Sequence, residues 1–493
     1  MRCIRITPAD NVAVALTDLK AGEQVCGITL VSDVPAGHKF TLRGLKAGDN
    51  VVKYGCPTGH VIIDIPCGHL VDHNCIATNL SGLLEYSYEP SFPETVPAKD
   101  RAVFKGYRRA DGQVGIRNQI WIIPTVGCAN GICGTLAERF REEISGREGS
   151  VDAVVAFPHN YGCSQLGGDH QNTRTILADM VHHPNAGGVL VVSLGCENNQ
   201  LDAFMELVGE VDGSRVRTMT LQNVEGDEIE YGLELLRGIF KACSGDTREE
   251  VPASELKVGL KCGGSDGLSG ITANPLVGVF SDWVVEQGGT TVLTEVPEMF
   301  GAETLLMNRC ADRTLFDRTV ALINDFKEYF MASGQPVYEN PSPGNKAGGI
   351  STLEEKSLGC TQKSGSSAVR GVLKYGERLS QKGLNLLSAP GNDLVASTAL
   401  AASGCQIVLF TTGRGTPFGS FVPTMKISTN SRLAALKPTW IDFNAGVLAE
   451  DAPMSQVAAQ FRDYILKVAS GEPVNNERNG WREIAIFKTG VTL

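Results

Sequence analysis

The sequence predicts an α/β protein, with a small N-terminal β domain followed by two α/β lobes with largely parallel sheets. Residues 1–88 contain short apolar runs separated by glycine-containing turns. From Arg101 onward, longer apolar runs end in Gly, Cys, Asn or Pro, and helical stretches often follow them. Such continuous runs are typical of buried parallel strands, and the helix completes a βα unit. A chain of 493 residues is also too long for one ordinary domain.

The first unit, residues 1–88, is expected to be a small β-barrel or sandwich. Its turn signals recur about every ten residues, and runs such as "NVVKYG" and "HVIIDI" lie between them, which is the spacing of short strands. The segment at 89–100 contains Pro90, Pro93 and Pro97 within "YEPSFPETVPAKD" and is predicted to be a linker.

The remaining chain is divided by a polar joint, "CSGDTREEVPASE". We therefore expect one α/β domain over residues 101–245 and a C-terminal α/β domain over 246–493. The apolar runs that predict their strands include "QIWIIPTVGCANG", "AVVAFPHNYGC", "GGVLVVSLGCENN", "KVGLKCGGSDG", "TTVLTEVPEM", "LNLLSAPGND" and "QIVLFTTGRGTP".

Composition excludes several classes of protein. The net charge of −11 and the absence of a Lys/Arg-rich block argue against nucleic-acid binding. No apolar run approaches the roughly 20 residues that a membrane span needs, and the N-terminus lacks the apolar core of a secretory signal, so a cytoplasmic location is expected. The fourteen cysteines include no CxxC pair, and we expect them to be reduced as buried residues, metal ligands or reactive thiols.

Chemically active side chains gather after the predicted strands. In open parallel sheets, ligands bind beyond the carboxyl ends of the strands. Four cysteines at four different strand ends indicate the rim of an active site, and the sequence therefore predicts an enzyme. The residues at these positions are Cys128, Cys163, Cys196, Cys262, His159, Glu197, Asp266, Glu295, Asp393 and Arg414.

The stretch "AFPHNYGCSQLGGDHQNTRT" brings two histidines and a thiol to one loop after a strand. Imidazole suits metal binding and can act as a general acid or base. The alternative is that His159 and His170 are hydrogen-bonded core histidines. Because they share the loop with Cys163 and Asp169, we favour a functional interpretation.

Three glycine-rich segments, "CGGSDGLSG", "TTGRGTPFG" and "NPSPGNKAGGISTLEEKSLG", match neither a Walker sequence nor a dinucleotide fingerprint. Tight turns, or close approach of backbone to a small hydroxylated ligand, are expected instead. The third segment is long and irregular, which is typical of functional or disordered loops, and its polar groups Lys346, Glu354 and Lys356 favour function.

Half of the eight histidines lie in the N-terminal unit, close to Asp64 and Asp72. Imidazole together with carboxylate suits Fe²⁺, Mn²⁺ or Zn²⁺. Exposed turn residues are an equally weighted alternative. The four are His38, His60, His69 and His73.

Long motifs along the chain resemble the altronate dehydratase family, which also includes galactarate dehydratase. The resemblance extends from the N-terminal domain to the closing "FKTGVTL". The motifs are "FPHNYGCSQLGGDHQNTRT", "GCENNQ", "GGSDGLSGITANP", "TEVPEMFGAE", "YENPSPGNKAGGISTLEEKSLGCTQK", "SAPGNDLVA" and "GRGTPFGSFVPT".

The resemblance implies elimination of water from a sugar acid to give a 2-keto-3-deoxy acid. For D-altronate the product is 2-keto-3-deoxy-D-gluconate, in hexuronate catabolism; galactarate or another sugar acid is the alternative substrate. The family implies Fe²⁺, with Mn²⁺ as a substitute, and an N-terminal SAF domain whose histidines bind metal. His38 matches the family's Gly-His-Lys turn, whereas "GHLVDHNC" departs from the His-x-His-Asn run that altronate members often show. Either Asp72 replaces one histidine of that run, or His69 and His73 are shifted; the resemblance thus implies His38, Asp72 and His73 as the expected ligands.

Dehydration of a sugar acid needs several groups. A cation or metal stabilises the enediolate, a base removes the C2 proton and an acid protonates the departing C3 hydroxyl. We expect His159, His170 and Lys346 to be catalytic and Cys163 to line the site, while Arg414 suits bidentate carboxylate binding. The further predicted substrate-binding residues are Asn198, Ser265, Asp266 and Asn345.

Two rival functions remain open from the sequence. In an Fe–S hydro-lyase, three cysteines hold a cluster whose open iron binds the substrate hydroxyl. The other rival is a non-catalytic sugar-acid sensor. In either case the partner is a small molecule, and base rates favour a homo-oligomer, with a dimer preferred. The cysteines that could converge on a cluster are Cys128, Cys163, Cys196, Cys262 and Cys360.

Overall fold

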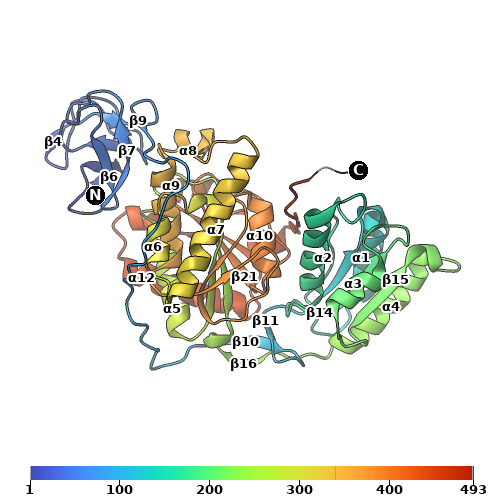
Figure 1. The fold of residues 1–493 in the computed structure, drawn as a ribbon. Helices are drawn as coiled ribbons and strands as arrows, with labels where there is room; N and C mark the ends of the chain where they lie inside the picture. The colour runs from blue at the N-terminus through green and yellow to red at the C-terminus, as the bar shows by residue number, and fades with distance from the viewer. Residues whose placement is uncertain (1, 339, 491, 493) are drawn as a thin grey trace.

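The structure is a computed structural model that describes residues 2–338, 340–490 and 492. An N-terminal β domain lies at one end of the molecule, the C-terminal α/β domain occupies the centre and a second α/β domain lies at the other end (Figure 1). The predicted fold class is confirmed. No helix among the described residues is long and apolar enough to cross a membrane.

The N-terminal domain consists of short antiparallel strands. Two sheets, in the orders β1-β2-β5-β8 and β6-β7-β9, and the β3-β4 hairpin enclose small apolar cores. The strands are β1 (Cys3–Ile4), β2 (Val12–Ala15), β3 (Gln24–Val25), β4 (Ile28–Thr29), β5 (Lys39–Thr41), β6 (Asn50–Lys53), β7 (Cys56–Val61), β8 (Leu70–Val71) and β9 (Ile76–Ala77).

Two turns of this domain repeat the same hydrogen-bond pattern. Asp33 accepts from the backbone N–H of Ala21 and from Lys20 Nζ, at 3.0 and 2.7 Å. Asp64 accepts equivalently from Ala47 and Lys46, at 3.0 and 2.8 Å. The domain therefore contains an internal repeat in which a carboxylate closes each turn.

Two cysteines of this domain do not fit the sequence prediction. Cys3 and Cys26 form a disulfide. The expectation that all cysteines are free is therefore wrong for this pair, because strand β1 and the turn after β3 bring two distant thiols together.

The second domain has a parallel sheet in the order β13-β12-β14-β15, with helices on both faces. Ile120 and Ile122 of β12 pack on α1 and α4, whereas Trp121 and Ile123 pack on the side of α2 and α3. This alternation follows from the two-residue period of a strand. The elements are β12 (Gln119–Pro124), η1 (Gly127–Ala129), α1 (Asn130–Ile144), β13 (Ala153–Ala156), α2 (Gly167–Val181), β14 (Ala186–Ser193), α3 (Leu201–Val208), β15 (Val216–Thr220), η2 (Leu221–Asn223) and α4 (Glu228–Cys243).

The C-terminal domain has a seven-stranded parallel sheet in the order β19-β20-β18-β17-β21-β22-β23. Its strands are β17 (Lys257–Cys262), β18 (Thr290–Leu293), β19 (Val369–Leu373), β20 (Gly383–Leu387), β21 (Ile407–Thr412), β22 (Thr424–Ser428) and β23 (Phe443–Asn444). Its helices are η3 (Ala253–Glu255), α5 (Ala273–Glu286), η4 (Val296–Glu298), α6 (Glu303–Met307), α7 (Arg313–Ala332), α8 (Pro343–Ala347), α9 (Leu353–Cys360), η5 (Thr361–Ser364), α10 (Asp393–Ala402), α11 (Ser431–Leu436), η6 (Gly446–Ala449), α12 (Met454–Ala469) and α13 (Asn475–Arg478).

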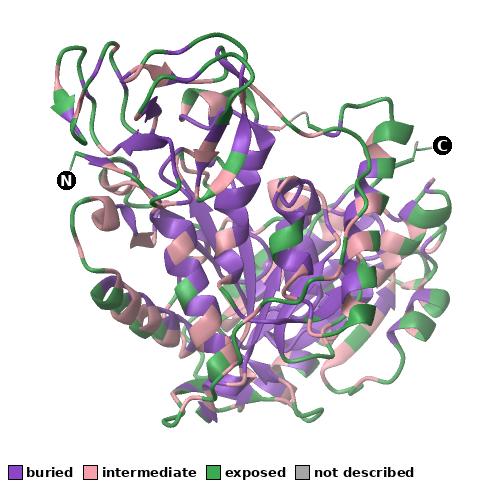
Figure 2. Cartoon of the chain, turned by 60° about the vertical axis from the view of Figure 1, so that its left-hand side comes forward, coloured by how far each residue is buried: buried purple, intermediate pink, exposed green. Residues whose placement is uncertain are grey.

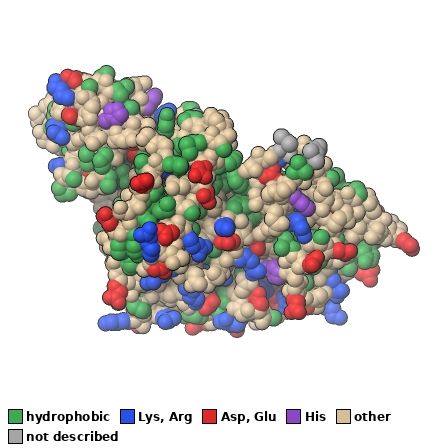
Figure 3. Space-filling model, viewed as in Figure 1, with side chains coloured by type: hydrophobic (Ala, Val, Ile, Leu, Met, Phe, Trp, Pro, Cys, Tyr) green, Lys and Arg blue, Asp and Glu red, His purple; other side chains and the backbone are tan. Residues whose placement is uncertain are grey.

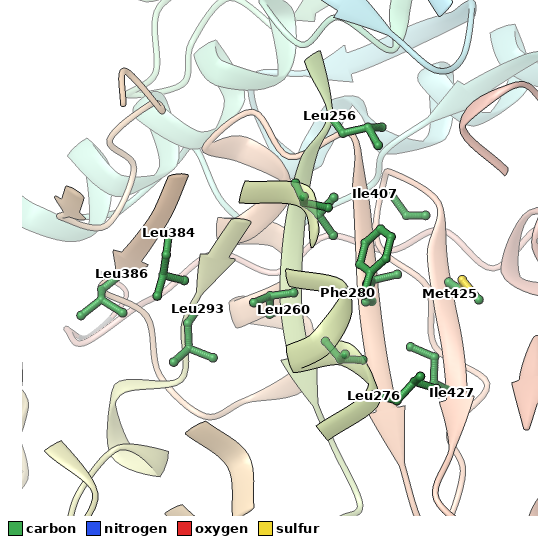
Figure 4. Packing of buried hydrophobic residues seen from close by; sticks show 14 of the residues in the cluster. Leu256, Leu260, Leu276, Phe280, Leu293, Leu384, Leu386, Ile407, Met425 and Ile427 are labelled. Atoms are coloured by element: carbon green, nitrogen blue, oxygen red, sulfur yellow. The ribbon is translucent and has the colours of Figure 1, made fainter. Parts of the chain in front are cut away.

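The strands of this sheet are buried almost throughout, as the continuous apolar runs predict (Figure 2). Leu260, Leu293 and Ile427 project from three strands onto the side of the sheet where Leu276 and Phe280 of α5 pack (Figure 4). This packing fixes the carboxyl ends of the strands, where the candidate site lies.

A three-stranded antiparallel sheet connects the two α/β domains. Strand β10 (Val103–Arg108) pairs with β11 (Val114–Gly115) and with β16 (Glu249–Pro252), which follows the second domain in the chain. Phe104 and Val251 from this sheet belong to the core of the C-terminal domain. The segment before it, the predicted linker, runs along the C-terminal domain, where Ser91 and Ala98 make backbone hydrogen bonds.

Candidate active site

The N-terminal and C-terminal domains meet through backbone at a glycine-lined junction. A Cβ atom at Gly267 would lie 1.8 Å from the carbonyl oxygen of Gly37, and one at Gly349 would lie 2.5 Å from it. Gly267 also donates to Gly348 O at 2.8 Å. Any side chain at Gly267 or Gly349 would separate the domains, which explains two of the glycine-rich segments.

A buried carboxylate fastens the same junction. Glu355 of α9 accepts from Lys39 Nζ and from Lys53 Nζ, both at 2.8 Å and both from the N-terminal domain. Ser351 completes the arrangement by accepting from Lys39 at 2.6 Å. Burial opposes the charged form of Glu355, but the two ammonium groups lower its pKa to about 2. The carboxylate is therefore ionised at neutral pH and holds the two domains together.

A cavity of about 660 Å³ opens beside this junction. Its wall includes Gly37 from the N-terminal domain and the loops after three neighbouring strands, β17, β21 and β22. Such a position, beyond the carboxyl ends of parallel strands, is where ligands bind in open α/β sheets. Polar side chains in its lining include Asp266, Arg414 and Asn430.

Asp266 is the most strongly held acid of the cavity wall. Its oxygens accept from Thr429 Oγ1 at 2.8 Å, Ser269 Oγ at 3.0 Å and Asn430 Nδ2 at 3.2 Å. Burial nevertheless raises the pKa of Asp266, because all these donors are uncharged. A carboxyl group with a raised pKa at a cavity wall is suited to proton transfer.

The loop containing α8 supplies further polar groups. Ser342 is the N-cap of this helix, and Asn345 completes the capping box by accepting from Ser342. Asn345 also donates to Ser265 O at 2.8 Å, which fixes the loop against the end of β17. Arg414 is exposed and donates to Gly344 O at 3.4 Å. The structure thus brings together the four substrate-binding residues predicted in the C-terminal domain, which are Ser265, Asp266, Asn345 and Arg414. Lys346 lies on the same helix and is half-buried.

Behind the cavity wall lies a buried cluster of charges. Lys261 pairs with Glu295 and with Asp393, and Lys363 pairs with Glu295 at 3.3 Å. Glu295 has a left-handed backbone at φ 68°, a strained conformation of the kind that collects at functional sites.

Two thiols and a carboxylate of this cluster form a metal-type group. Cys262, Glu298 and Cys360 have ligand atoms within 4.8 Å of one another, the only such group among the described residues. The two sulfur atoms are 3.3 Å apart, and each is 3.2 Å from Glu298 Oε2. Burial opposes ionisation of Glu298, but nearby lysines, chiefly Lys356, lower its pKa to about 2.

A small internal space of about 10 Å³ separates this group from the cavity wall. Asp266 and Cys360 both line it, together with Lys53 and Tyr54 of the N-terminal domain. The space is about the size of one water molecule. The N-terminal domain therefore closes the site from one side.

Family models match nearly the whole chain. They are described as the altronate/galactarate dehydratase SAF domain over residues 1–79, the D-galactarate dehydratase/altronate hydrolase second domain over 106–244 and the D-galactarate/altronate dehydratase C-terminal domain over 253–492. The chain belongs to the altronate/galactarate dehydratase family. The resemblance found in the sequence is confirmed, and the N-terminal domain is a SAF domain.

Curated relatives agree over the full length. A protein named altronate dehydratase from Bacillus subtilis (strain 168) is 57% identical over 99% of both chains. One of the same name from Escherichia coli (strain K12) is 58% identical over 100% of both. Galactarate dehydratase (L-threo-forming) from E. coli is 33% identical over 95% of this chain and 93% of its own.

The predicted metal ligands of the SAF domain are not gathered. His38, Asp72 and His73 do not form a close group in the part of the chain that the structure describes. His73 is exposed, and both oxygens of Asp72 accept from Asn74. His38 is half-buried next to Gly37 of the cavity wall, and burial lowers its pKa.

The predicted residues of the second domain lie apart from the cavity. His159, His170, Cys163 and Asn198 follow its own sheet and do not line the cavity. Cys163 and Asn198 are exposed, and Asn198 Oδ1 accepts from the backbone of Ser164 at 2.7 Å.

His159 has no free ring nitrogen. Its Nε2–H donates to Pro124 O at 2.7 Å, and its Nδ1 accepts from Tyr161 N at 3.1 Å. His183 repeats this arrangement, with Cys405 O and Asn185 N as partners, both at 3.2 Å. Both histidines thus cross-link backbone segments through their two ring nitrogens, and the catalytic role expected for His159 stays a prediction. His170 differs, since its buried Nε2 has no partner among the described residues.

The sequence prediction missed the lysines of the buried site. Lys39, Lys53, Lys261 and Lys363 lie within or beside apparent strands and turns, where nothing local distinguishes them from solvent-facing lysines. The one available signal was that a lysine such as Lys261 lies inside an apolar run, "KVGLKC", where neighbouring side chains are expected to be buried.

We expect the stability of the protein to fall with acidification through these histidines. Burial lowers the pKa of His159 to about 4 and that of His183 to about 3. Below pH 6.5, the pKa of histidine in the unfolded chain, the unfolded state therefore binds protons that the native state does not bind. The full loss is on the order of 3–5 kcal/mol for each site and is complete only below about pH 3–4, with about 2 kcal/mol of it per site lost between about pH 7 and about pH 5. Urea midpoints should drop between about pH 7 and about pH 5. His159→Gln should flatten this dependence, and His73→Gln, at an exposed site, should leave it unchanged; equal slopes in all three proteins would contradict the assignment.

Removing the carboxylate that fastens the SAF domain should release that domain. In Glu355→Gln two buried lysines lose their counter-charge, a change that costs about 3–5 kcal/mol. Trypsin should then cleave faster after the exposed Lys99, before global unfolding begins. The control Glu138→Gln, on the exposed face of α1, should show wild-type cleavage. Wild-type cleavage of Glu355→Gln would show that the junction does not depend on this ion pair.

Proposed function

We propose that the protein dehydrates D-altronate to 2-keto-3-deoxy-D-gluconate and water, in hexuronate catabolism. The full-length identity of 57% and 58% with two proteins named altronate dehydratase carries this proposal. The galactarate dehydratase is more distant, at 33%. The cavity between the SAF and C-terminal domains is the proposed active site.

Cations beside the cavity account for recognition of the substrate carboxylate. Arg414 is exposed in the cavity wall and offers a planar pair of donors. Lys346 lies on α8, beside the carbonyl that Arg414 contacts, and its ammonium group has no polar partner among the described residues. We assign both to the substrate carboxylate.

Two groups are assigned to proton transfer. His38 is kept neutral by its lowered pKa, so it can accept the C2 proton. Asp266, whose pKa is raised, can hold a proton for the departing C3 hydroxyl. The two come from different domains, so the reaction would depend on the junction that Glu355 fastens.

The buried thiol–carboxylate group fits a divalent metal, and we assign Fe²⁺ to it. Cys262, Glu298 and Cys360 offer two sulfurs and one oxygen, a donor set that favours Fe²⁺ or Zn²⁺ over Mn²⁺. Loss of two thiol protons would balance the charge of the ion. When bound, Fe²⁺ supplies a Lewis acid that stabilises negative charge on a substrate oxygen.

We propose a cytoplasmic location. All cysteines of the described chain except the disulfide pair Cys3 and Cys26 are free, and thiols persist in reducing compartments. The homodimer expected from base rates stays a prediction.

The activity is tested with D-altronate, using anaerobic protein supplied with Fe²⁺. We expect a 2-keto-3-deoxy acid to form and kcat/KM to fall about 10²-fold in Arg414→Ala. His38→Gln and Asp266→Asn should lower kcat by about 10²–10⁴. Arg313→Ala, on exposed α7, is the control. Turnover of galactarate but not of D-altronate would show that galactarate is the substrate. Full activity in the three site variants would show that the active site lies elsewhere.

Iron binding should depend on the buried thiols. Anaerobic titration with Fe²⁺ alone, without sulfide, should show one ion fewer per chain for Cys262→Ser than for wild type, because one sulfur ligand is lost. Cys67→Ser, in the SAF domain, should bind as wild type does. Equal stoichiometry in Cys262→Ser and wild type would remove the metal from this group.

A further inference from the structure

Three cysteines of the second domain are exposed together at one edge of its sheet. Among the free cysteines of the described chain, only Cys128, Cys163 and Cys196 are exposed. Free cysteine is among the residue types most often buried, so three exposed thiols call for an explanation. They follow β12, β13 and β14, which are neighbouring parallel strands, so their loops emerge at the same edge.

Backbone hydrogen bonds tie the three loops to one another. Gly127, next to Cys128, donates to Tyr161 O at 2.9 Å. Gly162, next to Cys163, accepts from Asn199 N at 3.0 Å, and Asn199 lies in the loop of Cys196. The contact of Ser164 with Asn198 joins the same two loops again. The three loops that carry the thiols are therefore joined to one another by hydrogen bonds.

The polar residues around these loops serve to hold them. Glu197 is buried and accepts from Thr125 Oγ1 at 2.6 Å, Ser193 Oγ at 2.7 Å and Gly195 N at 2.6 Å, which anchors the loop of Cys196 to the end of β12. His159 likewise anchors the loop of Cys163 to Pro124.

One glycine shows how closely these loops pack. At Gly162 the backbone has φ 96°, and a Cβ atom would lie 2.1 Å from Thr125 O. No other residue fits there. His159, Gly162 and Glu197 thus hold the loops in place, and the three cysteine side chains on these loops are exposed.

We propose that Cys128, Cys163 and Cys196 bind an iron–sulfur cluster through three thiolates, leaving one iron open to an external oxygen ligand. Thiolates are the ligands of such clusters. Around a single tetrahedral ion, sulfurs lie about 3.8 Å apart, given bonds of about 2.3 Å. The described residues gather three ligand atoms within 4.8 Å only at Cys262, Glu298 and Cys360, so at least one pair of the three exposed sulfurs lies farther apart than the sulfurs around a single ion. Gln222 Nε2 also donates to Cys196 Sγ at 3.5 Å, the kind of hydrogen bond that tunes a cluster.

This site is distinct from the proposed dehydration site. The cavity at the SAF junction includes none of the three cysteines, and the buried pair Cys262 and Cys360 belongs to a different sheet. Its test needs no substrate, so failure of the altronate proposal would leave it standing.

The test is reconstitution of the full-length protein, under anaerobic reducing conditions, with Fe²⁺ and inorganic sulfide. After removal of unbound material, wild type should retain acid-labile sulfide and absorb broadly near about 400 nm. Cys128→Ser, Cys163→Ser and Cys196→Ser should each lose bound sulfide and this absorption. The controls Cys67→Ser and Cys262→Ser should retain both. Because the three thiols are exposed, circular dichroism should show that the variants remain folded.

A second measurement uses the unmodified chain. Alkylation of folded protein with iodoacetamide, read by mass spectrometry, should label the three thiols before reconstitution and spare them afterward. Wild type that retains no sulfide would overturn the proposal. So would three variants that keep wild-type sulfide, or thiols that alkylate equally before and after reconstitution.

Discussion

The buried carboxylate of Glu355 is the interaction on which the candidate active site depends. It forms ion pairs with Lys39 and Lys53 of the SAF domain, and all three side chains are buried. Removing either the carboxylate or a lysine would leave an unpaired buried charge and lower the stability of the protein. Because the backbones beside it touch through glycine, the ion pair fixes the position of the cavity wall as well as the attachment of the domain. The site exists only while the two domains are in register.

Polar residues of the two α/β domains serve different ends. In the C-terminal domain, carboxylates, thiols and ammonium groups are buried in contact with one another, and Glu298 and Lys363 have pKa values shifted by their charged neighbours. In the second domain, His159 and Glu197 are saturated by neutral partners and support loops. The surface of the molecule adds no extended region of one charge sign on the face in Figure 3, where acidic and basic side chains are interspersed.

The sequence was a good guide to the sheets and to their active edge. Apolar runs located the parallel strands, and Asp266, Arg414 and Cys262 lie at strand ends as expected. It could not tell which strand ends share a sheet, so residues of two separate sheets were merged into one site. Nor could it distinguish a histidine saturated by backbone, such as His159, from one with a free nitrogen, since both follow a strand and precede a helix. The partners of Lys39 lie more than 300 residues away and leave no local signal.

The small sheet formed by β10, β11 and β16 has a consequence for how such a chain can be assembled. Val103 pairs with Pro252 and Gly106 with Glu249, so the chain leaves and re-enters the C-terminal domain at neighbouring points. Topologically, the second domain is an insertion within a larger host domain, and its two ends are already adjacent. Insertions with adjacent ends can be exchanged between host folds without rewiring the host. The second domain could therefore be deleted or exchanged for another domain between β10 and β16. Such a variant would need to cover the apolar surface that α2 and α10 share.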